Sequence, residues 1–212
     1  KIIESFLSYS ILYNQFSEIK KTKVYKIDSD LWQFVANYVG NNSKIYYLEF
    51  GVYSGTSIKF FAKQNKNKDS QFYGFDSFIG LPEDWTKIHK KGTFNTEGKI
   101  PKINDNRIKF IKGWFQNTLV EFLKKVKIED EIIIHYDADL YSSTLYCLTQ
   151  LHYKLNFYYA IFDEFTGDES RALSNYISSY GAKVTFLART RNKYNHTQQL
   201  FCKIEPTIPV KY

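Results

Sequence analysis

The chain has 212 residues, of which 43% are hydrophobic and 24% charged, and it carries a formal net charge of +7. This balance is typical of one globular domain and excludes a disordered tail or a fibre. No apolar run approaches the roughly 18 to 20 residues of a membrane helix, and residues 1–20 lack the apolar core of a signal peptide. The chain begins at Lys1 and contains no methionine, so we expect a longer natural chain.

The cysteines and the lysines limit the setting of the protein. Cys147 and Cys202 are far apart in sequence and form no CxxC or Cys/His pattern, which argues against a disulfide scaffold or a zinc finger. A reducing, cytoplasmic compartment is therefore the default. The lysines are scattered along the chain, which favours a solubilising surface, and an anionic small substrate or a nucleic acid are the alternatives.

The N-terminal part of the chain has a helical pattern. Apolar side chains such as Leu31, Phe34 and Val35 recur at helical spacing, and the pattern ends at Gly40. We therefore predict a helical N-terminal segment over residues 1–44.

From residue 45 onward, short aromatic and β-branched runs alternate with helix-like stretches. Several runs show no polar alternation, as in strands buried on both faces, and the intervening helices imply crossover connections and a parallel sheet. The last two runs are joined by a loop and predict an antiparallel pair at one edge. Ligands bind beyond the carboxyl ends of the strands in such a sheet. The predicted strands are 45–50, 72–75, 108–111, 131–136, 158–162, 183–188 and 199–204.

The turn LEFGVYSGTS, residues 48–57, follows the first of these strands. A dinucleotide fingerprint would have glycine where Glu49 and Ser54 stand, and a carboxylate there would repel a pyrophosphate, so NAD is disfavoured. Gly51 and Gly55 let the backbone approach a ligand closely while Glu49 supplies negative charge. S-adenosylmethionine, which has cationic sulfonium and ammonium groups and no phosphate, fits this turn. An ordinary turn between strand and helix is the alternative.

Asp76 ends the second strand, in the segment GFDSF. An acidic side chain at this place can accept hydrogen bonds from both hydroxyls of a ribose. Alone, it is equally well explained as a turn former. Taken together with the turn at 48–57, we interpret Asp76 as part of a cofactor site.

Carboxylates also follow the fourth and fifth crossover strands: Asp137 and Asp139 after one, Asp163 and Glu164 after the other. These strands are expected to be neighbours, so the side chains should converge. Two carboxylates about 5 Å apart repel by roughly 3 kcal/mol, and such a cluster should recruit a cation or hold a proton. Oxygen ligands suit magnesium, manganese or calcium. The alternatives are that Asp139 caps the next helix and that Glu164 is solvated.

Several common site patterns are missing. None of the four histidines forms an HxxxH or Cys/His pair, which argues against zinc. The sequence also lacks a GxSxG elbow and a Walker loop, so the commonest classes of hydrolase and nucleoside triphosphatase are excluded.

Five segments in order resemble the S-adenosylmethionine-dependent O-methyltransferases related to macrocin O-methyltransferase. They are LEFGVYSGTS (48–57), GFDSFIGLPEDW (74–85), KGWFQNTL (112–119), HYDADLYSST (135–144) and IFDEF (161–165). The resemblance implies an α/β class I methyltransferase fold over residues 45–212, with a seven-stranded, mostly parallel sheet that has an antiparallel edge strand. It implies a loop over the cofactor from Phe78 to Trp85, within a lid candidate at 78–105.

The resemblance also implies a set of site residues. Cofactor contacts are implied at Glu49, Gly51, Ser54, Asp76 and Ser77. A divalent metal, usually magnesium, is implied at Asp137, Asp163 and Glu164, and Glu164 stands where the family usually has aspartate.

The activity implied is transfer of a methyl group to a hydroxyl of a sugar, in a nucleotide sugar or a glycosylated small molecule. The metal would polarise the hydroxyl, and Asp137 and Asp139 would be the catalytic residues, with Asp139 or a nearby histidine taking the proton. The alternatives are a glycan, lipid-linked or phenolic acceptor, and a non-catalytic S-adenosylmethionine-binding or RNA-binding protein. We expect neither nucleic acid nor a membrane span, and a homodimer stays open.

Overall fold

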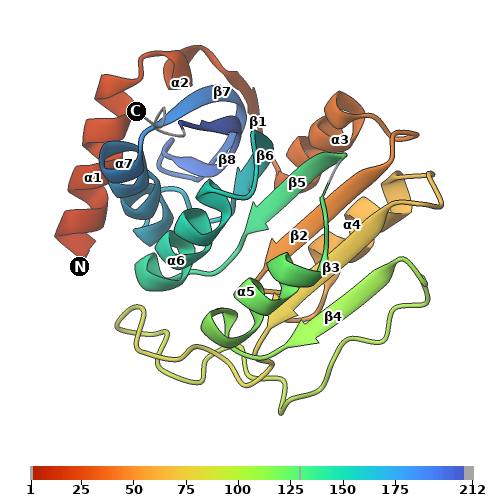
Figure 1. Cartoon of the computed structure of the whole chain (residues 1–212). Helices are drawn as coiled ribbons and strands as arrows, with labels where there is room; N and C mark the ends of the chain where they lie inside the picture. The colour runs from red at the N-terminus through yellow and green to blue at the C-terminus, as the bar shows by residue number, and fades with distance from the viewer. Residues whose placement is uncertain (1, 129, 208–212) are drawn as a thin grey trace, which may run out of the picture. The chain divides into compact units, whose positions relative to one another are not determined.

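The computed structural model describes residues 2–128 and 130–207 (Figure 1). The chain forms two compact units. The first unit joins Lys1–Val35 to Ile133–Tyr212, and the second unit is Ala36–Ile132. These units group elements by packing, so they do not test the predicted boundary along the chain between residues 44 and 45, which stays a prediction.

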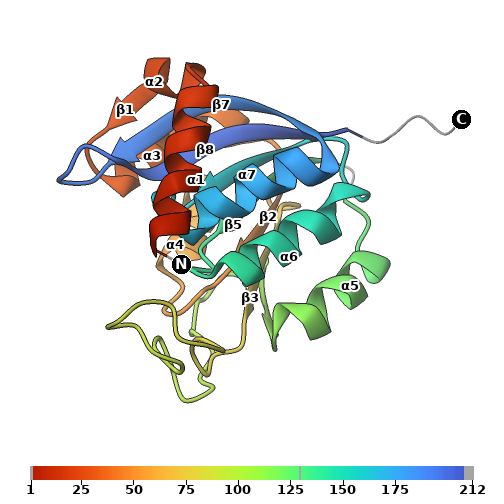
Figure 2. The same ribbon diagram turned by 90° about the vertical axis from the view of Figure 1, so that its left-hand side faces the viewer.

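The first unit contains strands in the order β1-β7-β8-β6-β5. β1 is parallel to β7, β8 is antiparallel to both β7 and β6, and β6 is parallel to β5. Figure 2 shows β7 and β8 side by side along their length. β6 is a continuous apolar run with almost every residue buried, as expected for a central strand. The bounds are β1 Lys23–Tyr25, β5 Glu131–Tyr136, β6 Tyr158–Phe162, β7 Ala182–Arg191 and β8 Thr197–Pro206.

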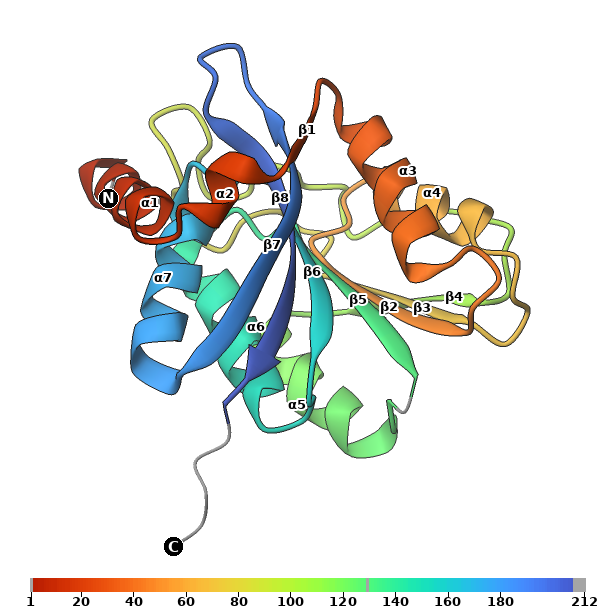
Figure 3. The same ribbon diagram turned by 90° about the horizontal axis from the view of Figure 1, so that it is seen from above.

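Helices of the first unit pack on this sheet and on one another. α1 lies beside α7 (Figures 2 and 3), where Arg171 bonds Glu4 at 2.8 Å. The buried guanidinium of Arg189 donates hydrogen bonds to the hydroxyls of Thr22 and Tyr13. These bonds connect the N-terminal segment to β7. The helices are α1 Ile2–Gln15, α2 Glu18–Lys21, α6 Tyr141–His152 and α7 Asp168–Tyr180, with α3 Asp28–Val39 leading into the second unit.

The second unit contains the parallel strands β2 (Ile45–Phe50), β3 (Gln71–Asp76) and β4 (Ile108–Lys112) in that order. α4 (Thr56–Gln64) and α5 (Phe115–Lys125) belong to the same unit. The core is aromatic, and Gly74 is required in it. A Cβ at Gly74 would lie 2.8 Å from a methyl carbon of Val52 and 2.9 Å from the ring of Phe110.

The predicted α/β class with a mostly parallel sheet is confirmed, and the antiparallel pair predicted from the last two runs is β7 and β8. The described residues form eight strands where seven were predicted. The additional strand, β1, lies within the segment predicted to be helical and is the outermost strand of the first unit. Three residues are too few to give a periodic signal, so pairing with β7 decides their structure. Among the described residues, no helix is long and apolar enough to cross a membrane.

Candidate functional site

The turn after β2 is built from left-handed backbone conformations. Gly51 has φ +95°, Tyr53 +48° and Gly55 +77°. Glycine adopts such angles without strain, whereas Tyr53 must be held in place by its surroundings. The amide of Gly55 donates to the carbonyl of Val52 at 2.8 Å and closes the turn. α4 starts at Thr56 with Gly55 as its N-cap, so no side chain caps the first amides of this helix.

Asp76, at the end of β3, fixes this turn. Its Oδ2 accepts hydrogen bonds from the amides of Val52 at 2.8 Å and Tyr53 at 2.9 Å. Its Oδ1 accepts one from the amide of Phe78 at 2.7 Å. Phe78 is also left-handed, with φ +59°. The carboxylate therefore joins the glycine turn to the segment after β3 and stabilises two strained residues. The predicted ribose contact of Asp76 stays a prediction beside this structural role.

The other predicted cofactor residues lie close by in the same unit. Glu49 pairs with Gly74 in the sheet register; its side chain is fully buried, and its Oε2 accepts a hydrogen bond from the Tyr47 hydroxyl at 2.6 Å. Ser77 shapes a local turn, because its hydroxyl donates to the carbonyl of Gly80 at 3.2 Å. Ser54 is exposed on the turn itself.

This set of groups fits the predicted cofactor. Left-handed glycines allow close approach of a ligand, a helix start without a side-chain cap favours a carboxylate, and acidic side chains favour cationic groups. S-adenosylmethionine matches these features, because it has a carboxylate and cationic sulfonium and ammonium groups and carries no phosphate.

The lid candidate at 78–105 begins with a loop closed on itself. The amide of Leu81 donates to the carbonyl of Thr93, and the amide of Gly92 donates to the carbonyl of Leu81, both at 2.9 Å. A Cβ at Gly80 would lie 2.4 Å from the carbonyl oxygen of Gly92, so only glycine allows this approach. The segment is thus an ordered hairpin-like loop anchored at Asp76.

The carboxylates after β5 and β6 belong to the first unit, where the two strands are neighbours as predicted. Oδ1 of Asp163 accepts a hydrogen bond from the side-chain amide of Gln199 and lies 3.6 Å from Nε2 of the buried His135. Gln199 in turn accepts a hydrogen bond from the indole of Trp32 at 3.0 Å. Asp163 is therefore held in a polar network that spans α3, β5, β6 and β8.

Three further carboxyl groups, those of Glu164, Glu169 and Asp28, form an acidic cluster with Asp163. Burial raises the pKa of Glu164 from 4.5 to about 7, and the nearby charges of Asp163 and Asp28 add to this shift. A hydrogen bond from Gln198 acts in the opposite direction. Burial, reinforced mainly by Asp163, raises the pKa of Glu169 well above its usual value, and Oε2 of Glu169 accepts from the Glu164 amide at 3.0 Å. Burial also raises the pKa of Asp28, which accepts a hydrogen bond from Thr190.

The predicted metal ligands do not fit a metal centre in this structure. In the described ranges, no group of three or more His, Cys, Asp or Glu side chains is placed to hold an ion. Asp163 is engaged by Gln199, and burial raises the pKa of Glu164 to about 7. The capping alternative for Asp139 is not observed, because Leu140 is the N-cap of α6 and Asp139 is left-handed, with φ +58°.

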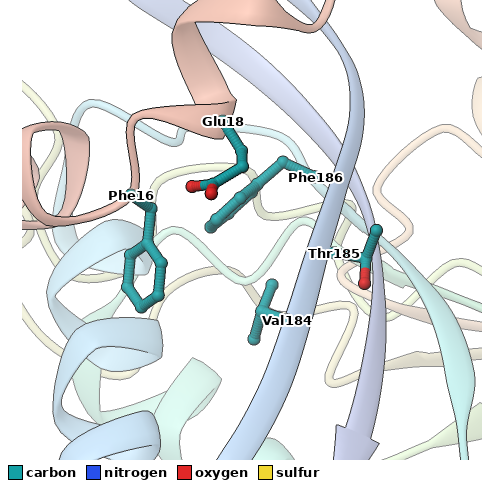
Figure 4. A pocket seen from close by; sticks show the side chains of 5 residues that line it. All are labelled: Phe16, Glu18, Val184, Thr185 and Phe186. Carbon is teal, nitrogen blue, oxygen red and sulfur yellow. The ribbon is translucent and has the colours of Figure 1, made fainter.

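A hollow on the first unit lies apart from these residues (Figure 4). It is lined by Phe16, Glu18, Val184, Thr185 and Phe186, which come from the α1–α2 region and the first half of β7. None of the predicted site residues lines it.

The model of the family described as macrocin O-methyltransferase (TylF) matches residues 29–183, which is more than half of the chain. The chain belongs to the macrocin O-methyltransferase family. The family prediction is thus confirmed, and the matched range contains every site residue predicted from the sequence.

Two relatives illustrate the likeness to this family of O-methyltransferases. Demethyldecarbamoylnovobiocin O-methyltransferase of Streptomyces niveus is 25% identical over 144 residues, which are 58% of this chain and 53% of that protein. The chain thus spans about half the length of this curated relative. The solved structure of the O-methyltransferase NovP has a TM-score of 0.57 at 20% identity, covering 85% of this chain and 79% of that chain.

Two more solved structures share the fold. Calicheamicin methyltransferase CalS11 has a TM-score of 0.56 at 16% identity, covering 82% of this chain and 75% of its own. A Bacillus cereus O-methyltransferase solved with SAH has a TM-score of 0.56 at 11% identity, covering 97% and 100%. At these identities the likeness concerns the fold.

Sequence reasoning missed three residues of the acidic cluster in this family member. Asp28 and Glu169 lie in the first turns of α3 and α7, where acidic residues are common because they favour the helix dipole. Gln199 is one polar residue at the start of an apolar run. In the sequence, the signal for this cluster was the number of carboxylates that the predicted fold would bring near the end of β6.

Proposed function

We propose that this chain is an S-adenosylmethionine-dependent O-methyltransferase that acts on a sugar hydroxyl, in a nucleotide sugar or a glycosylated small molecule. The observation that carries the proposal is the glycine turn at 51–55, fixed by Asp76 at the carboxyl ends of two parallel strands. Ligands of such sheets bind at this edge. The family supports O-methyl transfer, and the structural neighbour CalS11, described as a TDP-rhamnose 3′-O-methyltransferase, supports the choice of a sugar as acceptor.

The proposed roles of the cofactor residues follow from their places. Gly51 and Gly55 let the backbone approach the donor, and the first amides of α4 favour its α-carboxylate. Oδ1 of Asp76 accepts one hydrogen bond from the backbone, donated by the amide of Phe78. Its second lone pair would accept a hydrogen bond from a ribose hydroxyl. Glu49 supplies negative charge beside Gly51 for the ammonium group. When bound, the donor supplies a methyl group already activated by its sulfonium.

The acceptor must be held in line with that methyl group, and its hydroxyl proton must be removed. We propose Asp137 and Asp139, which follow β5, as the catalytic residues. Asp137 would orient the acceptor hydroxyl, and Asp139 would take its proton. The predicted magnesium is not part of this proposal, because in the described residues no three His, Cys, Asp or Glu side chains are placed to hold an ion.

Binding of the demethylated donor, S-adenosylhomocysteine, provides the first test. Calorimetry on folded protein should show saturable binding, and Asp76→Ala should weaken it by about 1 to 3 kcal/mol because a charged acceptor is lost. The exposed Asp69, changed to Ala, is the matched control. No uptake of this ligand by folded protein would contradict the proposal.

Transfer of a labelled methyl group provides the second test. The panel should contain nucleotide sugars, free sugars, lipid-linked sugars and phenols, each with and without chelator. A nucleotide sugar or glycoside should be the best acceptor, whereas transfer to phenols or lipid-linked sugars alone would favour the alternative acceptors. Binding of the donor product without any transfer would favour a non-catalytic protein. A cytoplasmic location and a homodimer stay predictions.

A further inference from the structure

Four aromatic side chains form a continuous row on the second unit. The rings of Trp85 and His89 are nearly parallel with centroids 5.1 Å apart, and His89 and Phe94 are nearly parallel at 5.7 Å. Phe94 meets Tyr53 edge to face at 5.7 Å. We call these four residues the ring row. It starts at Tyr53, in the glycine turn proposed to bind the donor, and crosses the lid candidate.

The ring row is partly exposed although three of its members are large aromatic residues with apolar rings. Tyr53 is 51% exposed and Phe94 is 40% exposed, while Trp85 and His89 are half-buried. Exposed apolar surface that is contiguous usually serves binding. Trp85 is the end of the row, because His89 is the only ring partner that the described residues give it.

Backbone and side-chain bonds hold the ring row in place. The amide of Trp85 donates to the carbonyl of His89 at 3.0 Å, and the hydroxyl of Thr86 lies 3.2 Å from Nδ1 of His89. Tyr53 and Phe94 are both left-handed, with φ +48° and +66°. Strained backbone persists where the surrounding structure fixes it, and it concentrates at binding sites. The ring row is therefore preorganised rather than a chance contact between mobile side chains.

Two exposed lysines lie between members of the ring row in the sequence. Lys87 and Lys91 alternate with its members along the chain, and both are exposed. Neighbouring Lys90 is paired with Asp84 at 3.0 Å, but within residues 2–128 and 130–207 neither Lys87 nor Lys91 has a carboxylate within 4.0 Å. An aromatic stack with unpaired ammonium groups beside it matches a planar ring joined to an anionic group.

We propose that the ring row binds the planar ring carried by the sugar acceptor, and that this ring is the base of a nucleoside diphosphate sugar. The base would extend the stack beyond Trp85, and Lys87 and Lys91 would bind the diphosphate. An aromatic aglycone would offer the same ring without the anionic group, so the lysines favour the nucleotide. This inference rests on the proposed function, which supplies the sugar acceptor.

Thymidine 5′-diphosphate, which lacks the sugar to be methylated, is the probe. Calorimetry on the full chain should show saturable binding that Trp85→Ala and Trp85→Leu both weaken by about tenfold, as expected for loss of one stacked base. The exposed ring of Tyr194, changed to Ala, is the matched control and should leave affinity unchanged. Equal affinity of the probe for the parent and both Trp85 variants would overturn the proposal.

A second pair of variants tests the diphosphate. Lys87→Ala combined with Lys91→Ala should weaken the nucleotide several-fold and reduce its salt dependence, while the exposed Lys68→Ala should not. An uncharged aryl glycoside should bind these lysine variants as it binds the parent. If the aryl glycoside depends on Trp85 and the nucleotide does not, the ring is an aglycone and the nucleotide proposal is wrong.

Binding of S-adenosylhomocysteine separates this inference from the proposed function. Its affinity should be the same in the parent and in every variant of Trp85, Lys87 and Lys91. A loss of this affinity in the Trp85 variants would assign the ring row to the adenine of the donor and overturn the inference. If the parent binds S-adenosylhomocysteine but not the nucleotide, the inference fails while the proposed function stands.

Discussion

Asp76 should stabilise the second unit as well as bind ligand. Its carboxylate accepts three backbone hydrogen bonds, from Val52, Tyr53 and Phe78, at 2.7 to 2.9 Å. Each hydrogen bond to a charged group contributes about 1.5 to 3 kcal/mol net, and the bond to Tyr53 lies near solvent and should contribute least. We therefore expect Asp76→Ala to lower the free energy of unfolding by about 3 to 6 kcal/mol.

Urea denaturation followed by circular dichroism measures this effect. Asp76→Asn keeps one acceptor oxygen, so it can bond the glycine turn or Phe78 but not both, and its loss should be smaller. Asp69→Ala, at an exposed carboxylate, should change stability by no more than about 0.5 kcal/mol. If Asp76→Ala weakens S-adenosylhomocysteine while its unfolding free energy equals that of the parent, Asp76 acts on the ligand alone and the structural role is refuted.

Two further predictions concern the first unit. The pKa of Glu164 is raised from 4.5 to about 7, so the folded state binds this proton more tightly. The resulting stability is fully present below about pH 4.5 and is lost as the pH rises through 7, by about 3 kcal/mol. Glu164→Gln should therefore remove this contribution to the pH dependence of the unfolding free energy, measured by urea denaturation at a series of pH values. The exposed Glu18→Gln is the control. The same pH dependence in Glu164→Gln and the parent would contradict the assignment. Calorimetric titration with magnesium chloride should give no saturable binding, because in the described residues no three carboxylates are placed to hold an ion, and one tightly bound ion per chain would contradict this.

The parts of the fold that the sequence predicted are those coded by local patterns. The apolar runs identified the strands of both units, and the turn at 48–57 identified the end of β2 because glycine spacing and Glu49 are adjacent in the chain. The strand ends differ by a few residues, since pairing with neighbours extends a strand beyond its apolar run. β1 was missed for the same reason: only its partner β7 makes Lys23–Tyr25 a strand.

The roles that the sequence did not predict depend on contacts between distant residues. Asp76 was assigned to a ribose from its place at a strand end, but its bonds to Val52 and Tyr53 join residues more than twenty positions apart. The hydrogen bond that Gln199 donates to Asp163 joins residues 36 positions apart. Local patterns carry no information on such pairs, and without the structure Gln199 is one polar residue in a strand.

The acidic cluster near the end of β6 presented two alternatives at the level of sequence: recruitment of a cation or retention of a proton. Charge repulsion among buried carboxylates must be relieved by one of them, because water is excluded. In the structure, Asp28 and Glu169 join Asp163 and Glu164 in the cluster. Burial raises the pKa of three of these four carboxyl groups, namely Asp28, Glu164 and Glu169. Gln199 donates to the remaining one, Asp163. In the described residues, raised proton affinity and an amide donor therefore reduce the repulsion, and the longer Glu164, where the family usually has aspartate, belongs to this arrangement.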